Sequence, residues 1–96
     1  MLVVSNRLPV ADGREDEFEA LFDERASMAM DRVGLRRLEP LRPVEANTYV
    51  IQAYWESRDA FERWRASDDF KTAHAGLPTD LFTGANQLEV HELAVE

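Results

Sequence analysis

The chain has 96 residues and a mass of 11.0 kDa, which is the size of one domain and leaves too little sequence for a second core. It has no cysteine, so a disulfide scaffold, a thiolate metal site and a cysteine nucleophile are excluded. Its formal net charge of -8 repels phosphate backbones and anionic lipid headgroups, so we expect no nucleic-acid partner and no membrane partner. A cytoplasmic protein is expected, because no run approaches the ~20 apolar residues of a membrane span and residues 1–10 do not resemble a signal peptide.

The first predicted element is a strand over Leu2–Leu8, a short and partly β-branched run. Pro9 ends it, because proline has no amide hydrogen to donate to a sheet ladder. Asp12 and Glu15 have the spacing of a capping box, so a helix is predicted to begin there and to end within residues 31–34. One face of this helix carries apolar residues at helical spacing, namely Phe18, Leu21, Phe22, Met28 and Ala29.

The next two predicted strands differ in how well they fit the interior of a sheet. Residues 35–44 include Pro40 and Pro43, so this segment is predicted to be an interrupted or bulged strand at a sheet edge. A turn is predicted at residues 45–47. The run Thr48–Trp55 is dense in β-branched and aromatic residues and is the clearest strand of the chain.

Two serines divide the helical segment that follows. Ser57 is placed to cap a short helix that carries Phe61 and Trp64. Ser67 is placed to cap a second helix that runs to His74, where a glycine and a proline soon end it. The sequence therefore predicts a helical segment that is broken in the middle.

The last predicted strand follows a polar loop and covers residues 87–95, with a bulge where the apolar alternation changes parity between Val90 and Leu93. The order β, α, β, β, α, β is that of the ferredoxin-like motif, an α+β fold in which helices cover one face of an antiparallel sheet. We expect this fold to form a single domain over residues 1–96. Because the strands are rich in apolar residues, we expect the open face to pair with a second subunit in a homodimer.

Three residues are candidates for chemistry, and each also has an ordinary structural interpretation. His74 lies at a predicted helix end, where the macrodipole favours an imidazolium cation, whereas a neutral imidazole there is a potential iron ligand. Trp64 is by default an apolar core residue. Asn6, polar within an apolar strand, is by default a hydrogen-bonding residue of a strand end. The sequence has no glycine-rich phosphate loop, no HExxH motif and no clustered metal-ligand spacing.

Two sequence blocks carry a resemblance to a known family. Asn6-Arg7-Leu8 lies early in the first strand, and YWESRDAFERWRASDDFKTAH covers residues 54–74. Through these blocks the chain resembles the antibiotic-biosynthesis-monooxygenase superfamily, and within it the IsdG/IsdI type of haem-degrading monooxygenase. The resemblance implies a dimeric α/β barrel and an oxidoreductase for which haem is both substrate and cofactor. It also implies dioxygen and an external electron donor, either a reductase or a small reductant.

The same resemblance implies a role for each of the three candidates. His74 supplies the proximal nitrogen to the haem iron and leaves the opposite axial position open. Asn6 donates a hydrogen bond on the oxygen-binding side of the iron, and Trp64 presses on the porphyrin and distorts it. A net charge of -8 opposes the two haem propionates, and the cations considered for offsetting them are Arg7, Arg63 and Lys71.

Two other functions are compatible with the same fold. The first is a cofactor-independent monooxygenase of this superfamily that acts on a quinol or a polyketide-like aromatic substrate. The second is a non-catalytic haem-binding module, a carrier or a sensor, that holds haem without consuming it. Haem degradation ranks first because the combination of Asn6, Trp64 and His74 is specific to that subgroup.

Overall fold

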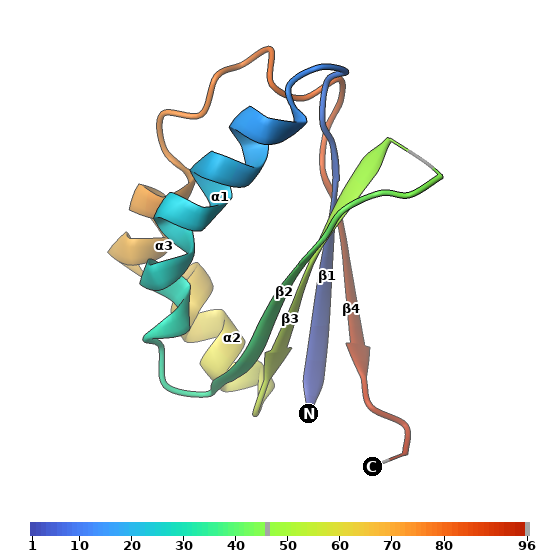
Figure 1. The fold of residues 1–96 in the computed structure, drawn as a ribbon. Coiled ribbons are helices and arrows are strands. Elements are labelled where there is room, and N and C mark those ends of the chain that lie inside the picture. Colours follow the sequence, from blue (N-terminus) through green and yellow to red (C-terminus); the bar gives the residue numbers. More distant parts are fainter. Residues whose placement is uncertain (46, 96) are drawn as a thin grey trace.

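A four-stranded antiparallel sheet is covered on one face by a layer of helices (Figure 1). The computed structural model describes residues 1–45 and 47–95, so the predicted turn at residues 45–47 and the predicted domain over 1–96 fall partly outside it. The described elements are β1 (Leu2–Pro9), α1 (Glu15–Met30), β2 (Leu35–Leu41), β3 (Thr48–Trp55), α2 (Arg58–Arg65), α3 (Asp68–His74) and β4 (Gln87–Glu92). The strand order is β2-β3-β1-β4, which confirms the ferredoxin-like arrangement with its second helical segment broken in two.

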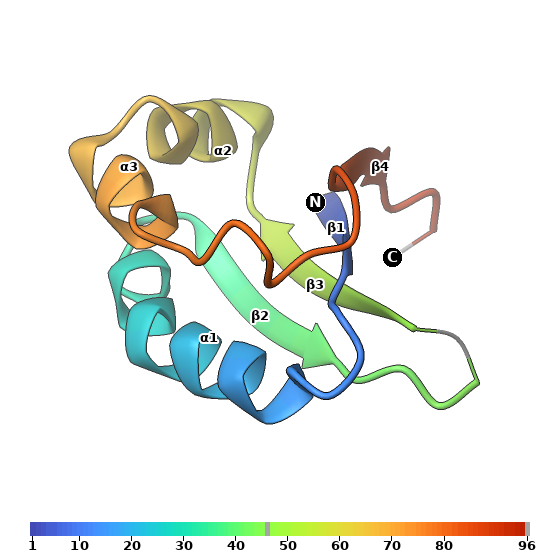
Figure 2. The same cartoon turned by 90° about the horizontal axis from the view of Figure 1, so that it is seen from above.

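Figure 2 shows the three helices side by side on the covered face, with the connection from α3 to β4 passing over the end of the sheet. Among the described residues, none of the helices combines the length and the apolar character that a membrane crossing needs. The sheet of this single chain is open and not a closed barrel, because β2 and β4 are its two unpaired edges.

The strand β2 lies at a sheet edge, as predicted, but it ends at Leu41, so it contains Pro40 and not Pro43, and its irregularity lies at the opposite end from the proline. The register against β3 shifts between Leu35 and Arg37. Leu35 and Leu38 are three residues apart and would point to opposite faces of a regular strand. The shift allows both to line the same cavity beneath the helices.

The predicted start of the first helix is wrong by two residues, because the cap is Arg14 and not Asp12. The amide of Arg14 bonds to the carbonyl of Ala11 at 3.1 Å, so Asp12 lies in a turn and Arg14 becomes the residue that precedes the helix. The carboxylate of Glu15 does reach back, and it accepts from the amide of Gly13 at 3.2 Å. The predicted capping box does not form, because the helix begins at Glu15 and the turn places Asp12 two residues before the cap.

The predicted bulge in the last strand is also wrong. Residues Gln87–Glu92 pair with β1 in an unbroken register, and the strand ends before Leu93. The amide of Leu93 instead bonds to the carbonyl of Met1 at 3.0 Å. The change of parity therefore marks the end of the strand.

Two hydrophobic clusters lie at opposite ends of the covered face. The first cluster packs one end of β1 and β3 against α2, and consists of Leu2, Val4, Trp55, Ala60, Phe61 and Trp64. The second cluster lies under α1 at the other end, and consists of Val10, Phe18, Tyr49 and Leu81. Between them the covered face presents Asn6, Ile51 and Ala53. A polar residue and a small residue at this point leave space that neither cluster fills.

The connection between α3 and β4, which was predicted only as a polar loop, is held against the sheet by a buried side chain and by backbone hydrogen bonds. Its Leu81 is 0% exposed and belongs to the second cluster. The amide of Ala11 donates to the carbonyl of Leu81 at 2.8 Å, and the amide of Thr83 donates to the carbonyl of Pro9 at 2.8 Å. This segment therefore reaches β4 along a fixed path.

The uncovered face of the sheet is less apolar than the composition suggested. Ser5 Oγ donates to Gln52 Oε1 at 3.2 Å, and Gln52 Nε2 donates to Tyr54 Oη at 2.7 Å. Arg7 pairs with Glu89 at 3.5 Å. Composition counts apolar residues but does not assign them to a face of the sheet. The expectation of an apolar uncovered face, from which the homodimer was predicted, is therefore wrong. The homodimer itself stays a prediction.

A polar cluster of Glu19, Arg42 and Tyr49 links α1 to the β2–β3 hairpin. The guanidinium of Arg42 binds both carboxylate oxygens of Glu19, at 2.7 and 2.5 Å, and the buried Tyr49 hydroxyl donates to the same carboxylate at 2.5 Å. The hydrogen bonds from Arg42 and then Tyr49 lower the pKa of Glu19 to about 2. Burial, and then the bond to Glu19, raise the pKa of Tyr49.

Replacement of Glu19 is expected to change the acid sensitivity of the fold. A carboxyl whose pKa falls from 4.5 to about 2 on folding stabilises the protein fully above pH 4.5, and this stabilisation is lost as the pH falls toward 2. We therefore expect the wild type to lose more unfolding free energy across this window than Glu19→Gln, as measured by urea denaturation at each pH. Tyr49→Phe keeps the Arg42 pair and is expected to retain most of the wild-type dependence. Identical pH profiles for the wild type and Glu19→Gln would contradict the assignment.

Candidate active site

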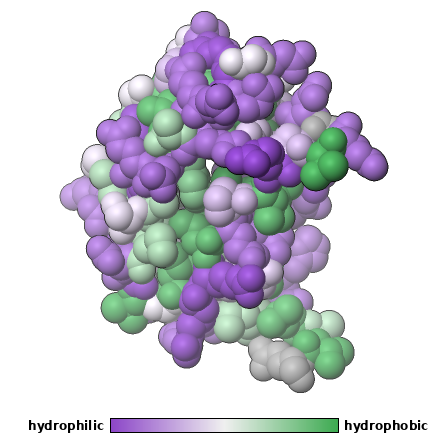
Figure 3. Space-filling model, viewed as in Figure 1, coloured by the Kyte–Doolittle hydropathy of each residue, from purple (hydrophilic) through white to green (hydrophobic). Residues whose placement is uncertain are grey.

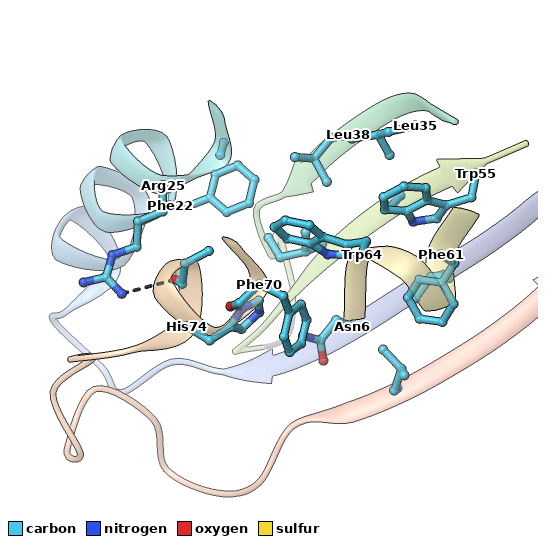
Figure 4. A pocket seen from close by; sticks show the side chains of 16 residues that line it. Asn6, Phe22, Arg25, Leu35, Leu38, Trp55, Phe61, Trp64, Phe70 and His74 are labelled. Carbon is cyan, nitrogen blue, oxygen red and sulfur yellow. Dashed lines mark hydrogen bonds between the residues drawn. The ribbon is translucent and has the colours of Figure 1, made fainter. Parts of the chain in front are cut away.

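All three predicted site residues line one cavity between the helical layer and the sheet (Figure 4). Its volume is about 170 Å³, and it contains Asn6 from β1, Trp64 from α2 and His74 from α3. The rest of the lining is apolar except for Arg25, and its aromatic members besides Trp64 are Phe22, Trp55, Phe61 and Phe70. The structure thus brings together three residues that are far apart in the sequence.

The break at Ser67 brings Trp64 and His74 into one cavity. In an unbroken helix, residues ten apart would be separated by about 15 Å along the axis and about 80° around it. Ser67 Oγ donates to the carbonyl of Trp64 at 2.7 Å and accepts from the amide of Phe70 at 3.1 Å. The hydroxyl therefore ends α2 and caps α3 at the same point, as the sequence predicts.

The indole of Trp64 is a buried residue of the first cluster and also a wall of the cavity. It is 7% exposed, so its ordinary structural interpretation is also correct. The guanidinium of Arg32 lies 5.7 Å from the ring centroid, and the ring of Phe70 meets it edge to face at 5.5 Å. Contacts on two sides fix the orientation of the indole.

The imidazole of His74 is oriented by Phe70 in two ways. Its Nδ1 lies 2.7 Å from the carbonyl oxygen of Phe70, one helical turn earlier, so Nδ1 carries the proton and donates it. Its ring lies against the ring of Phe70 at a centroid distance of 4.1 Å. In the neutral imidazole the remaining nitrogen, Nε2, carries the lone pair that can bind a metal. The sequence did not indicate that Phe70 stands between Trp64 and His74.

The side-chain amide of Asn6 has one end occupied. Its Oδ1 accepts from Asn86 Nδ2 at 2.9 Å. Because an amide carries an acceptor at one end and two donors at the other, the donors of Asn6 are the end available to a ligand. Asn86 is a second residue that the sequence did not single out.

The cation on the lining is Arg25, which sequence reasoning missed. Its Nη1 donates to the carbonyls of Ala73 and Ala75, at 3.2 and 2.6 Å, and so holds the end of α3 against α1. Of the cations considered from sequence, Arg7 pairs on the uncovered face, and Arg63 and Lys71 are exposed and do not line the cavity. Arg25 lies three residues after Phe22, and this helical spacing places both on one face of α1.

A second cavity of about 390 Å³ adjoins the first. Both cavities are lined by Asn6, Phe22, Ile51, Ala73 and His74. Figure 3 shows apolar surface in the recess between the helical layer and the sheet, bordered by hydrophilic residues. Asn6 and His74 therefore stand where the two spaces meet, inside an apolar cleft that opens to solvent.

Residues 1–76 match the family described as antibiotic biosynthesis monooxygenase. The chain belongs to this family. A haem oxygenase of Mycobacterium tuberculosis, described as mycobilin-producing, is 34% identical over 90 residues, which are 92% of this chain and 85% of that protein. The resemblance seen in the sequence blocks is thereby confirmed.

The solved structures that are similar to this chain include proteins of two kinds. One is the haem-degrader MhuD from Mycobacterium tuberculosis with two haems in its active site, at a TM-score of 0.84 and 26% identity, covering 100% of this chain and 98% of that one. Another is SnoaB, a cofactor-independent oxygenase from Streptomyces nogalater, at a TM-score of 0.83 and 26% identity, covering 99% and 94%. Similarity of fold alone does not separate the two activities within the family.

The role of Ser67, which lies between α2 and α3, can be tested by comparing the two serines that cap these helices. Ser67→Ala is expected to lower the unfolding free energy by about 1 kcal/mol and to speed amide hydrogen exchange through α3, because α3 loses its cap. Ser57→Ala removes a cap of the same kind from α2, where Ser57 Oγ accepts from the amide of Ala60 at 3.2 Å. It is expected to cost a similar free energy without affecting α3. Equal exchange rates in α3 for both variants would show that Ser67 does not position His74.

Proposed function

We propose that this protein is a haem-degrading monooxygenase that binds haem in the cleft of Asn6, Trp64 and His74, opens the porphyrin ring and releases the iron. The observation that carries the proposal is the placement of His74. Its Nδ1 faces the Phe70 carbonyl, so Nε2 is the nitrogen that remains for a ligand, on a residue that lines both adjoining cavities. A histidine that served only as a cation at the end of a helix would need no such cleft.

The residues present fit a haem group in shape and in chemistry. Cavities of about 170 and 390 Å³ meet at His74, and together they fall within the roughly 300–1,000 Å³ typical of ligand clefts. Aromatic and aliphatic walls suit the face of a porphyrin. Arg25 adds one positive charge beside this apolar lining, in a chain whose net charge of -8 otherwise opposes a ligand with two propionates.

Each site residue then has a defined task. When haem is bound, its iron and dioxygen supply the oxidising chemistry, and its porphyrin is the substrate. His74 would hold the iron through Nε2, with its ring oriented by Phe70. Asn6 would offer amide donors in the same cleft to stabilise developing negative charge. Trp64, whose indole contacts Arg32 and Phe70, would press on the porphyrin and distort it.

The proposal also covers the electron donor, the compartment and the oligomeric state. The chain contains no cysteine and so has no thiol to supply electrons, which we assign to an external donor, a reductase or a small reductant. We place the reaction in the cytoplasm, within one domain. We also assign the uncovered sheet face to a second copy of the chain in a dimeric α/β barrel, a state that sedimentation equilibrium measures directly.

A second candidate is a cofactor-independent oxygenase acting on a quinol or polyketide-like aromatic substrate. The similarity to SnoaB, at 26% identity and a TM-score of 0.83, favours it. An apolar cleft with one amide donor and one imidazole also suits an aromatic hydroxyl compound. A non-catalytic haem carrier would use the same cleft and differ only in leaving the haem intact.

The proposal is tested by mixing ferric haem with the protein and adding ascorbate in air, with catalase present to remove peroxide. We expect the wild type to bind haem and then to bleach its absorption. Asn6→Ala is expected to bind haem but to bleach it about 10² to 10³ times more slowly, because one stabilising donor is lost. Asn47→Ala makes the same change away from the cleft and is expected to bleach at the wild-type rate.

The other outcomes separate the candidates. Haem that stays bound and intact in the wild type would identify a carrier or sensor. Absence of haem binding, together with oxygen consumption on a quinol, would identify the cofactor-independent oxygenase. Either result would contradict haem degradation.

A further inference from the structure

We propose that Asn86 is a positioning residue that fixes which end of the Asn6 side-chain amide faces the active-site cleft. Asn86 Nδ2 donates to Asn6 Oδ1 at 2.9 Å. The two residues are 80 positions apart in the sequence and meet only because β4 pairs with β1. The orientation of the amide is inferred from this contact, and its consequence for turnover rests on the proposed function.

The backbone places Asn86 on the correct face of the sheet. In the β1–β4 ladder Asn6 is opposite Leu88 and Arg7 is opposite Gln87. Side chains alternate between the faces of a strand, so Asn86, two residues before Leu88, lies on the helix side together with Asn6. Both asparagines line the second cavity.

The segment that leads to Asn86 is held in place. Phe82 forms an isolated bridge with Val10, and the amide and hydroxyl of Thr83 both donate to the carbonyl of Pro9, at 2.8 and 3.3 Å. These bonds fix the chain to β1 three residues before Asn86. The Asn86 side chain is therefore presented from a fixed backbone, although the residue itself is exposed.

Without Asn86, either end of the Asn6 side-chain amide can face the cleft. The last torsion of an asparagine is broad and roughly two-fold, so oxygen and nitrogen exchange places at little cost. With Oδ1 held by Asn86, Nδ2 and its two hydrogens point the other way, toward the cleft. The opposite orientation would present a carbonyl oxygen, which repels negative charge in place of stabilising it. Asn86 thus determines the sign of the dipole that a ligand meets.

The test uses a nearly isosteric substitution to reverse the direction of the hydrogen bond between the side chains at positions 86 and 6. In Asn86→Asp the new carboxylate accepts hydrogen bonds but cannot donate, so Asn6 must turn Nδ2 toward it and its oxygen toward the cleft. Gln87→Glu is the matched control. It adds the same charge one residue later, but on the uncovered face opposite Arg7.

The first readout uses the protein without haem. In ¹⁵N-resolved NMR spectra, we expect a downfield shift of an Asn6 side-chain amide proton in Asn86→Asp, because it then donates to a carboxylate. We expect no such shift in Gln87→Glu. Asn86→Ala removes the donor to Asn6 Oδ1, so the Asn6 amide is expected to interconvert between two orientations and its side-chain signals to shift or broaden. Unchanged Asn6 signals in both Asn86 variants would overturn the inference, whether or not the protein binds haem.

The second readout uses ferrous haem with carbon monoxide as a probe. A donor beside the ligand lowers the C–O stretching frequency and a lone pair raises it, so we expect a higher frequency in Asn86→Asp than in the wild type and Gln87→Glu. Bleaching is expected to slow about 10²-fold in Asn86→Asp alone, as for loss of a stabilising donor. Shifted amide signals with an unchanged C–O frequency and rate would also overturn the positioning role. A wild type that neither binds nor bleaches haem would overturn the proposed function, while the haem-free spectra still decide the orientation.

Discussion

The hydroxyl of Ser67 donates to the carbonyl of Trp64 and accepts from the amide of Phe70, and these two bonds set the geometry of the site. They begin α3, a helix of 7 residues with no buried side chain among them. A helix this short is not stable on its own. It is held at its start by Ser67 and at its end by Arg25, which binds the carbonyls on either side of His74. Polar contacts therefore hold both ends of α3, while Phe70 and Ala73 pack against the first cluster and Phe70 orients the imidazole.

The cleft exists because the hydrophobic core is divided. One cluster under α2 and another under α1 stabilise opposite ends of the sheet, and the residues between them do not fill the space. Ala53 is too small, and Asn6 is polar. Trp64 belongs to the first cluster and also walls the cleft, so a residue that stabilises the fold also shapes the binding space. The same division leaves Asn6 and His74 on the lining of both cavities.

Local patterns predicted what depends on local chemistry. The serine caps, the edge strand that contains Pro40 and the strand Thr48–Trp55 follow from residues a few positions apart, and the structure has all of them. The resemblance identified Asn6, Trp64 and His74, and the structure places them in one cleft. Long-range contacts were not predictable in the same way. Arg25 reaches α3 across 48 to 50 positions, Asn86 reaches Asn6 across 80, and Leu81 is buried from a segment that sequence alone shows only as polar loop.

The claim that most needs a direct measurement is that Nε2 of His74 binds haem iron. Ferric haem should be titrated into the wild type and into His74→Gly, with and without added imidazole, and the Soret absorption followed. The account predicts that the wild-type spectrum is lost in His74→Gly and restored by imidazole, which takes the place of the missing ligand. His91→Gly removes the chain's other histidine, on the uncovered face, and should keep the wild-type spectrum. A wild-type spectrum in His74→Gly without imidazole would contradict the account.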